Sequence, residues 1–273
     1  MESVTEPSAR AESVPRRAWR GARAIVRLCL CLAIALVLAA AWFLGLCIVG
    51  RGPRRRVWRA SMVRRWARAS LWSANAKLEV QGTPPPAPCF LVANHVGWVD
   101  VWSLAASCDC VFVSMEELLR WPLFGPLARS VDTVFIVRER KRDIPAVNRS
   151  IEEAFTRGER VVFFPEGYST IGTSVDAFKP SLFEPAAQAG LPVGWATLHY
   201  ATGPRDWPAA FSVPWGDRNF ARQVWRFFSL DRIEARVRFG DGVLRGSDRK
   251  QLASELHARI EQLFVPLADG RSS

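Results

Sequence analysis

Short runs of β-branched and aromatic residues alternate with longer amphipathic runs over residues 77–264. The short runs have the length and composition of buried strands, and we expect strands at 78–80, 90–93, 111–113, 134–137, 161–164, 193–199 and 233–239. The longer runs predict helices at 99–106, 116–129, 144–156, 182–189, 222–228 and 248–264. This alternation predicts an α/β fold, in which helices cover a largely parallel sheet and sites lie at the carboxyl ends of strands.

A different pattern precedes this region. Residues 28–49 form a run of 22 residues without a charged side chain, and at 1.5 Å per residue a helix of that length can cross a hydrocarbon core of about 30 Å. A secretory signal has a shorter apolar region, of about 7 to 15 residues, followed by a cleavage site. We therefore expect a retained, membrane-associated helix or two-helix motif before the α/β domain.

The excess charge of the chain surrounds this segment. Residues 1–76 contain 14 arginines, no lysine and 3 glutamates, a net charge of +11, whereas residues 77–273 contain 23 basic and 23 acidic residues. A basic protein with a pI of about 10.2 can bind nucleic acid. Arginines beside an apolar helix are instead attracted to anionic lipid head groups, at about 1 kcal/mol each. We therefore expect membrane lipids, and no nucleic acid, as partners.

The arginines do not orient the segment. They stand before it at Arg16, Arg17, Arg20, Arg23 and Arg27, and after it at Arg51, Arg54, Arg55, Arg56 and Arg59. The positive-inside rule needs an excess of basic residues on one side. A crossing helix and a helical hairpin that enters and leaves by the same face both fit two basic flanks.

Candidate chemistry begins where the expected strand at 90–93 ends. In the run NHVGWVD, Asn94 and His95 follow that strand, and four residues separate His95 from Asp100. At this spacing a turn can bring the carboxylate to one imidazole nitrogen, which fixes the tautomer and leaves the other nitrogen free to take a proton. The run predicts a general base. A buried histidine with a capping aspartate would have the same pattern, so partners from other strand ends decide between the two.

Two further strand ends supply such partners. The strand at 161–164 stops at a proline and is followed by Glu166 and Gly167, with hydroxyl groups at Ser169 and Thr170. The strand at 134–137 is followed by Arg138, whose guanidinium can hold a phosphate in a bidentate manner. A glutamate that caps a helix and an arginine on the surface are the ordinary alternatives. In a parallel sheet these ends meet at one edge, where they can converge on His95.

These motifs resemble those of the glycerolipid acyltransferases. NHVGWVD is similar to their H-x4-D motif, FIVR at 135–138 to their second block, FFPEGYST at 163–170 to their F-P-E-G block, and FKPS at 178–181 to the basic segment after it. In order and spacing the chain resembles the 1-acylglycerol-3-phosphate acyltransferases, also called lysophosphatidic acid acyltransferases, from about residue 85 to 200. The membrane-associated helix pair is also similar to that family.

The resemblance implies a mechanism. His95, held by Asp100, removes the proton from an acceptor hydroxyl, which attacks the thioester of acyl-CoA or acyl carrier protein directly. The substrate-binding residues that it implies are Asn94, Arg138, Glu166, Gly167, Ser169, Thr170 and Lys179. The chain has no G-x-S-x-G nucleophile elbow. Its six cysteines and three histidines do not have zinc-site spacing, so we expect no metal, and no cofactor besides the acyl donor.

Departures from the family pattern concern the acceptor. Trp195 replaces the second proline of the fourth block, Ser114 and Met115 stand where a lysine is usual, and Asp132 takes a glycine position. The catalytic pair is intact. Lysophosphatidic acid is the first candidate acceptor, and another lyso-lipid, such as lyso-ornithine lipid, is the alternative. A membrane-anchored lipid or nucleic-acid binder without catalysis and a degenerate family member kept as a scaffold are more distant alternatives.

The chain thus divides into three parts. We expect a basic N-terminal tail at 1–23, a membrane-associated helical segment at 24–76 and an acyltransferase catalytic domain at 77–268. The expected location is the inner (cytoplasmic) membrane, with the catalytic domain on the cytoplasmic side.

Overall fold

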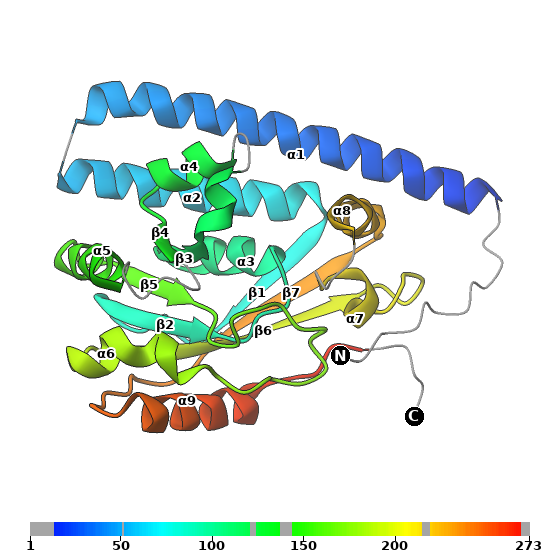
Figure 1. The fold of residues 1–273 in the computed structure, drawn as a ribbon. Helices are drawn as coiled ribbons and strands as arrows, with labels where there is room; N and C mark the ends of the chain where they lie inside the picture. The colour runs from blue at the N-terminus through cyan, green and yellow to red at the C-terminus, as the bar shows by residue number, and fades with distance from the viewer. Residues whose placement is uncertain (1–13, 51, 121–123, 137–143, 215–218, 269–273) are drawn as a thin grey trace.

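A computed structural model describes residues 14–50, 52–120, 124–136, 144–214 and 219–268 (Figure 1). Its centre is a seven-stranded sheet in the order β1-β7-β6-β2-β5-β3-β4. The strands are β1 Ala76–Gln81, β2 Cys89–Ala93, β3 Val111–Met115, β4 Val134–Ile136, β5 Arg160–Phe163, β6 Val193–Thr202 and β7 Ile233–Phe239. Neighbouring strands are parallel except β6 and β7, which are antiparallel. The predicted fold class is therefore confirmed.

The helices are α1 Val14–Val49, α2 Pro53–Ser73, α3 Val99–Ser107, α4 Phe124–Ser130, α5 Ile144–Thr156, α6 Glu184–Gln188, α7 Ala209–Ser212, α8 Phe220–Ser229 and α9 Arg249–Leu263. Two predictions were wrong in detail. The single helix expected at 116–129 is a 3-10 helix, Glu116–Arg120, and the short α4. The helix expected at 182–189 begins as a 3-10 helix, Pro180–Phe183, before α6. Prolines at 122, 126, 180 and 185 explain both, because proline removes a helical donor.

Both faces of the sheet are covered. In β2, Leu91 and Ala93 face a core shared with α2, α3 and α8, whereas Phe90 and Val92 face a second core shared with α5, α6 and α9. All five residues of β2 are buried, as a parallel strand between two helix layers requires. Figure 1 shows α9 below the sheet, and α2 and then α1 above it. The carboxyl end of β2 therefore lies at the middle of the sheet edge.

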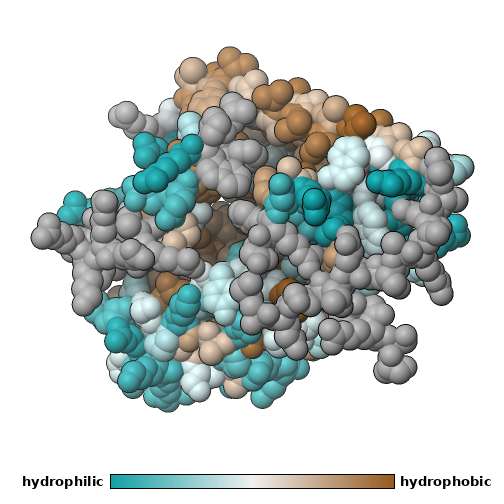
Figure 2. Space-filling view, turned by 45° about the vertical axis from the view of Figure 1, so that its right-hand side comes forward, coloured by the Kyte–Doolittle hydropathy of each residue, from teal (hydrophilic) through white to brown (hydrophobic). Residues whose placement is uncertain are grey.

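Helix α1 is longer than the apolar run. It begins at Val14 and therefore includes part of the segment 1–23 that was expected to be an N-terminal tail. Its 36 residues extend over about 54 Å. One face packs on α2 and α8, and the other exposes large apolar side chains, which form the brown surface along the top of Figure 2. We call these residues the apolar strip: Ile25, Val26, Leu30, Leu32, Leu36, Val37, Phe43, Leu44 and Ile48.

Arginines at the start of α1 bind the α/β domain, not open solvent. Arg20 donates to the carbonyl of Arg205 at 2.8 Å, and Arg23 donates to the carbonyl of Ser229 at 2.6 Å. Arg27 donates to the carbonyl next to Ser229, that of Leu230. The last two carbonyls lie at the C-terminal end of α8, which carries partial negative charge. These contacts use the charge of the three arginines within the molecule, and their contact with lipid head groups stays a prediction.

A second group of arginines fastens α2. Arg59 is buried and contacts Glu159 at 2.6 Å and Asp132 at 2.8 Å. Arg55 also pairs with Asp132, and Arg56 with Glu159. Asp132 lies in the turn between α4 and β4, Glu159 in the turn between α5 and β5. We call these five residues the Arg59 cluster. Asp132 has a φ of 62°, a conformation that favours glycine, which accounts for glycine as the usual family residue.

The Trp195 departure is explained by the opposite face of the sheet. Trp195 is buried in the core shared with α9, and a Cβ on Gly240 would lie 1.9 Å from its indole nitrogen. The indole of Trp195 therefore fits only because residue 240 is a glycine, which has no side chain. It packs away from the core that contains α3, so this departure fills the core beside α9.

Candidate active site

The sheet places His95 and Asp100 in one short turn between β2 and α3. Strand β2 ends at Ala93 and α3 begins at Val99, with Asp100 in its first turn. The backbone N–H of Asp100 donates to the carbonyl of Gly97 at 3.1 Å, which closes the turn. The tightness of this connection brings the carboxylate back under the imidazole, as the spacing predicts.

His95 and Asp100 form a hydrogen-bonded dyad. Their Nδ1 and Oδ2 atoms are 2.8 Å apart, and the same oxygen accepts from the backbone N–H groups of Val96 at 2.6 Å and Gly97 at 2.9 Å. Asp100 is completely buried, whereas the His95 side chain is 21% exposed. An ionised Asp100 requires the proton on Nδ1. Nε2, which has no hydrogen-bond partner among the described residues, is then the proton acceptor.

Phe164 holds the other side of the imidazole. The two rings are stacked, with centroids 4.0 Å apart and an interplanar angle of 13°. A flat apolar surface on one side and a carboxylate on the ring edge leave the imidazole little freedom to rotate. The dyad is therefore oriented before any substrate arrives.

Glu166 supports His95 through the backbone. It lies after β5, and its Oε1 accepts from the N–H of His95 at 2.6 Å while Oε2 accepts from the N–H of Asp176 at 3.0 Å. The side chain is fully buried, and burial raises its pKa to about 7. Both oxygens of Glu166 thus accept from backbone groups and connect the turn after β2 to the segment after β5, while its contact with the acceptor stays a prediction.

Asn94 also supports the site through backbone contacts. Its amide group donates to the carbonyl of Leu198 at 3.0 Å, its oxygen accepts from the N–H of Leu198 at 2.8 Å, and the residue is 2% exposed. Asn94 thus continues the pairing between β2 and β6 beyond the end of the strand. Because each polar group of the side chain has a backbone partner, the structure does not support the predicted contact with substrate.

The segment after Glu166 returns to the dyad. The N–H and the Oγ1 of Thr170 both donate to the carbonyl of His95, at 2.8 and 3.2 Å. Gly167 has a φ of 77°, and its N–H donates to the carbonyl of Phe164 at 3.0 Å, which closes the turn after β5. Half-buried Ser169 lies between Gly167 and Thr170.

Lys179 crosses the outside of this segment. Its Nζ lies 5.2 Å from the centre of the Tyr168 ring, and a Cβ on Gly167 would lie 2.7 Å from the same nitrogen. The missing side chain at Gly167 therefore leaves the space that exposed Lys179 occupies. This arrangement places one positive charge on the surface beside the F-P-E-G turn.

Arg138 lies outside the described residues. Strand β4, which leads to it, ends at Ile136 and is separated from β2 by β5 and β3. At about 4.8 Å per strand, the two strand ends are roughly 14 Å apart. Whether Arg138 belongs to the site stays a prediction.

Two residues of the site were missed by sequence reasoning. The hydroxyl of Tyr200 donates to Oδ1 of Asp100 at 2.7 Å, and it lies 3.0 Å from the Oγ of Ser103. Both residues are fully buried. The expected strand at 193–199 stopped just short of Tyr200. The side-chain period of two along this strand, continued from Ala196 and Leu198, would have placed Tyr200 on the face that meets α3.

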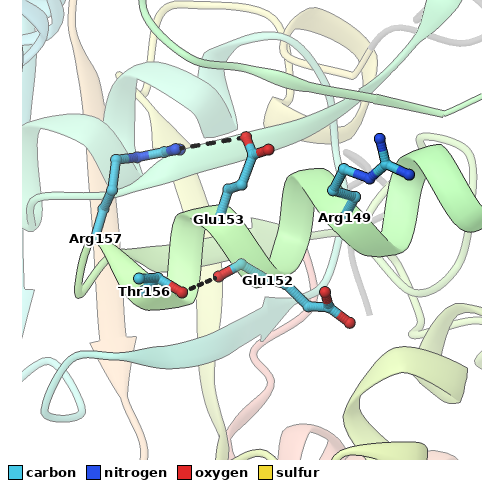
Figure 3. Close-up of a pocket in the computed structure, with 5 residues that line it drawn as sticks. All are labelled: Arg149, Glu152, Glu153, Thr156 and Arg157. Carbon is cyan, nitrogen blue, oxygen red and sulfur yellow. Dashed lines mark hydrogen bonds and ion pairs between the residues drawn. The ribbon is translucent and has the colours of Figure 1, made fainter.

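One surface hollow lies beside α5. This hollow, shown in Figure 3, is lined by four side chains of α5 and by Arg157 in the turn that follows it; the four are Arg149, Glu152, Glu153 and Thr156. Arg157 and Glu153 of this lining form an ion pair at 4.0 Å, drawn as a dashed line in Figure 3. None of these residues belongs to the dyad or supports it. Over the described ranges, no three His, Cys, Asp or Glu residues are grouped as metal ligands.

Comparisons with known proteins agree with this geometry. A family model for acyltransferases matches residues 77–194. The chain is 33% identical over 209 residues to a 1-acyl-sn-glycerol-3-phosphate acyltransferase of Neisseria meningitidis, covering 74% of this chain and 80% of that protein. It is 35% identical over 191 residues to a lyso-ornithine lipid O-acyltransferase of Rhodobacter capsulatus, covering 67% and 68%.

A solved structure is similar over nearly the whole length. The crystal structure of the 1-acyl-sn-glycerophosphate acyltransferase PlsC from Thermotoga maritima superimposes with a TM-score of 0.63 at 18% identity. The match covers 93% of this chain and 99% of that chain. The N-terminal helices are therefore part of the shared fold.

Proposed function

This chain belongs to the acyltransferase family and is an O-acyltransferase, and we propose that it transfers a fatty acyl group from acyl-CoA or acyl carrier protein to the free hydroxyl of a lyso-lipid. The observation that carries the proposal is the dyad, in which Asp100 holds Nδ1 of His95 at 2.8 Å and Nε2 has no hydrogen-bond partner among the described residues. A base of this kind suits an alcohol nucleophile, whose proton must leave as its oxygen attacks.

The proposed reaction is a direct transfer. Nε2 of His95 takes the proton of the acceptor hydroxyl, and the hydroxyl oxygen attacks the thioester carbon. The carbon–sulfur bond then breaks, and the thiolate leaves and takes the proton back from the imidazolium. Asp100 stabilises the imidazolium between these steps. The backbone contacts of Glu166 and Thr170 to His95 keep the ring in place.

The acceptor is the finer part of the proposal. Lysophosphatidic acid is the first candidate and lyso-ornithine lipid the second, because the two relatives described above carry these two names. Arg138 discriminates between them. A phosphate at the end of β4 would take a charge-assisted contact from Arg138 worth about 1.5 to 3 kcal/mol, whereas lyso-ornithine lipid has no phosphate.

A titration of both lyso-lipids tests acceptor and residue together. With wild type and Arg138→Ala, we expect the KM for lysophosphatidic acid to rise about tenfold or more and the KM for the acyl donor to stay unchanged. If lyso-ornithine lipid is the true acceptor, wild type uses it better and Arg138→Ala has a mild effect. A folded His95→Ala protein with normal turnover on either lipid would contradict the mechanism itself.

Membrane association completes the proposal. The apolar strip faces outward, and only 11% of the most apolar window of α1 is buried. Both halves of α1 are attached to the domain, by Arg23 near its start and by Trp42, whose indole N–H donates to Ser130 at 3.0 Å. A helix held along its length in this way favours a position within one leaflet over a crossing. We propose the cytoplasmic face of the inner membrane as the site of action.

A further inference from the structure

A chain of hydrogen bonds continues behind the dyad into the core. Oδ1 of Asp100 accepts from the hydroxyl of Tyr200 at 2.7 Å, and that hydroxyl lies 3.0 Å from the Oγ of Ser103. A tyrosine hydroxyl has one proton, and an ionised carboxylate can only accept. Ser103 must therefore donate to Tyr200, which donates to Asp100. Every bond in this chain points towards the base.

The two oxygens of Asp100 have separate partners. Oδ2 accepts from His95, Val96 and Gly97, all within the turn. Among the described residues, Oδ1 has one hydrogen-bond partner, Tyr200. Tyr200 lies on β6, 100 residues after Asp100 in the sequence. Because a carboxylate rotates about its last torsion, whose preferences are broad, a partner on Oδ1 fixes the direction of Oδ2.

We propose that Tyr200 is a positioning residue for the general base: its hydroxyl fixes the Asp100 carboxylate and shares its charge, and so sets both the orientation and the basicity of His95. The inference rests on the proposed role of the dyad. It adds a residue on β6 to the machinery, and Ser103 as the group that orients the tyrosine hydroxyl.

The electrostatics of the pocket agree with this role. Burial raises the pKa of Tyr200 well above its usual range, and neighbouring Asp100 raises it further, so the hydroxyl stays a donor wherever the enzyme works. In the part of the chain that the structure describes, the titratable groups that face the dyad are Tyr200 from β6, Glu166 from the turn after β5, and Asp176 beside Glu166. Without the Tyr200 hydroxyl, more negative charge stays on Oδ2 and the imidazolium is stabilised more.

The substitution Tyr200→Phe removes this hydroxyl and keeps the ring. We expect kcat to fall roughly tenfold, with the KM of each substrate unchanged within about twofold, because Tyr200 does not touch substrate. The acidic limb of the rate against pH should move up by roughly half a pH unit, because the base is then protonated at higher pH. Ser103→Ala should shift both quantities in the same direction by less.

Ser229→Ala is the matched control. Ser229 is another buried serine, whose hydroxyl donates to the carbonyl of Arg226 at 2.7 Å, within its own helix, and not to a member of the dyad network. It should change thermal stability without changing kcat or the pH profile. If Tyr200→Phe and Ser103→Ala behave like Ser229→Ala, with a lower Tm and wild-type kinetics, Tyr200 is structural and the inference is wrong.

His95→Ala separates this failure from a failure of the proposed function. An inactive His95→Ala protein together with wild-type kinetics of Tyr200→Phe overturns only the role of Tyr200. An active His95→Ala protein overturns the role of the dyad, and with it the present inference. The expected pattern is no activity for His95→Ala and the slowed, pH-shifted activity of Tyr200→Phe.

Discussion

Two buried networks of polar and charged side chains lie on the same side of the sheet, and they differ in the group at which they end. The network behind His95 runs from Ser103 through Tyr200 and Asp100 to an imidazole that is 21% exposed. The Arg59 cluster pairs arginines of α2 with Asp132 and Glu159, and its central members are buried on both sides. The first network ends at a partly exposed imidazole with an unused proton acceptor, whereas the second consists of ion pairs between groups of the protein.

This difference shows how the same chemistry serves two purposes. In both networks a buried charge needs ion-pair or hydrogen-bond partners, because they replace the water that it has lost. In the Arg59 cluster all partners are charged or backbone groups of the protein, so the arrangement fastens helices. In the dyad, Nε2 of His95 has no hydrogen-bond partner among the described residues, so it can accept a proton from another molecule. Substitutions in each network should therefore affect different measurements.

The largest effect is expected from opening the dyad network at its centre. Asp100→Ala leaves four donors without an acceptor, namely His95, Val96, Gly97 and Tyr200, and it releases the imidazole. We expect kcat/KM to fall by about a thousandfold to ten-thousandfold. Asp100→Asn should retain some activity, since an amide can still accept on one atom. Acyl transfer by a folded Asp100→Ala protein at near wild-type rate would exclude the dyad as the base.

The next effect comes from breaking the closed network. Arg59→Ala leaves Glu159 buried beside weaker partners, and removing one partner of a buried pair costs about 3 to 5 kcal/mol. We expect a large loss of unfolding free energy in denaturant titrations, with unchanged kcat per folded molecule. Arg65→Ala, an exposed arginine on the same helix, is the control and should be near neutral. Equal effects of the two variants would mean that the cluster does not fasten α2.

Glu166 allows a sharper test, because it joins the dyad turn to its neighbour and titrates. Burial raises its pKa from 4.5 to about 7, so between these values the native state holds a proton that the unfolded chain has released. The contribution of Glu166 to the free energy of unfolding should therefore be fully present below about pH 4.5 and be lost as pH rises through about 7, a change on the order of 3 kcal/mol. The test measures the free energy of unfolding of wild type and of Glu166→Gln from pH 5 to 8. The fall of this free energy with rising pH that Glu166 causes should be absent in the variant.

The smallest effect concerns the outer face of the helix pair. Val37 and Leu44 of the apolar strip are 68% and 69% exposed, and each contributes about 1.5 to 3 kcal/mol when fully buried in an apolar phase. Val37→Gln with Leu44→Gln should weaken binding to anionic vesicles at least tenfold in a sedimentation assay. Val80→Gln, at an exposed apolar position of β1, should not. Unchanged binding by the double variant would place the membrane contact elsewhere.

The sheet and the dyad could be predicted from sequence because their determinants are local. Each strand is a short apolar run, and His95 and Asp100 contact one another across a five-residue separation. The geometry of a turn fixes such a contact with little help from the rest of the chain. The strand ends were also predicted to converge, and Glu166 and Thr170 do lie against the backbone of His95.

The supporting contacts could not be predicted, because their partners are backbone groups or distant residues. Glu166 and Asn94 bind backbone N–H and carbonyl groups, which carry no signal in the sequence. Tyr200 meets Asp100 across 100 residues. The arginines of α1 find carbonyls at the end of α8, whereas their position beside an apolar run indicated lipid. Charge patterns predict that a partner exists but not which one.

The apolar strip of α1 has a consequence for how the enzyme meets its acceptor. An enzyme held at a lipid surface does not sample its lyso-lipid by diffusion in three dimensions, because both lie in the same layer. The quantity that sets the rate is then the fraction of surface molecules that are acceptor. Dilution of the acceptor with an inert lipid should slow the reaction even when the amount per volume is constant, while dilution of whole vesicles with buffer should matter little once the enzyme is bound. Because α1 attaches the enzyme to the surface, the rate depends on the surface concentration of the acceptor and not on its concentration in the bulk solution.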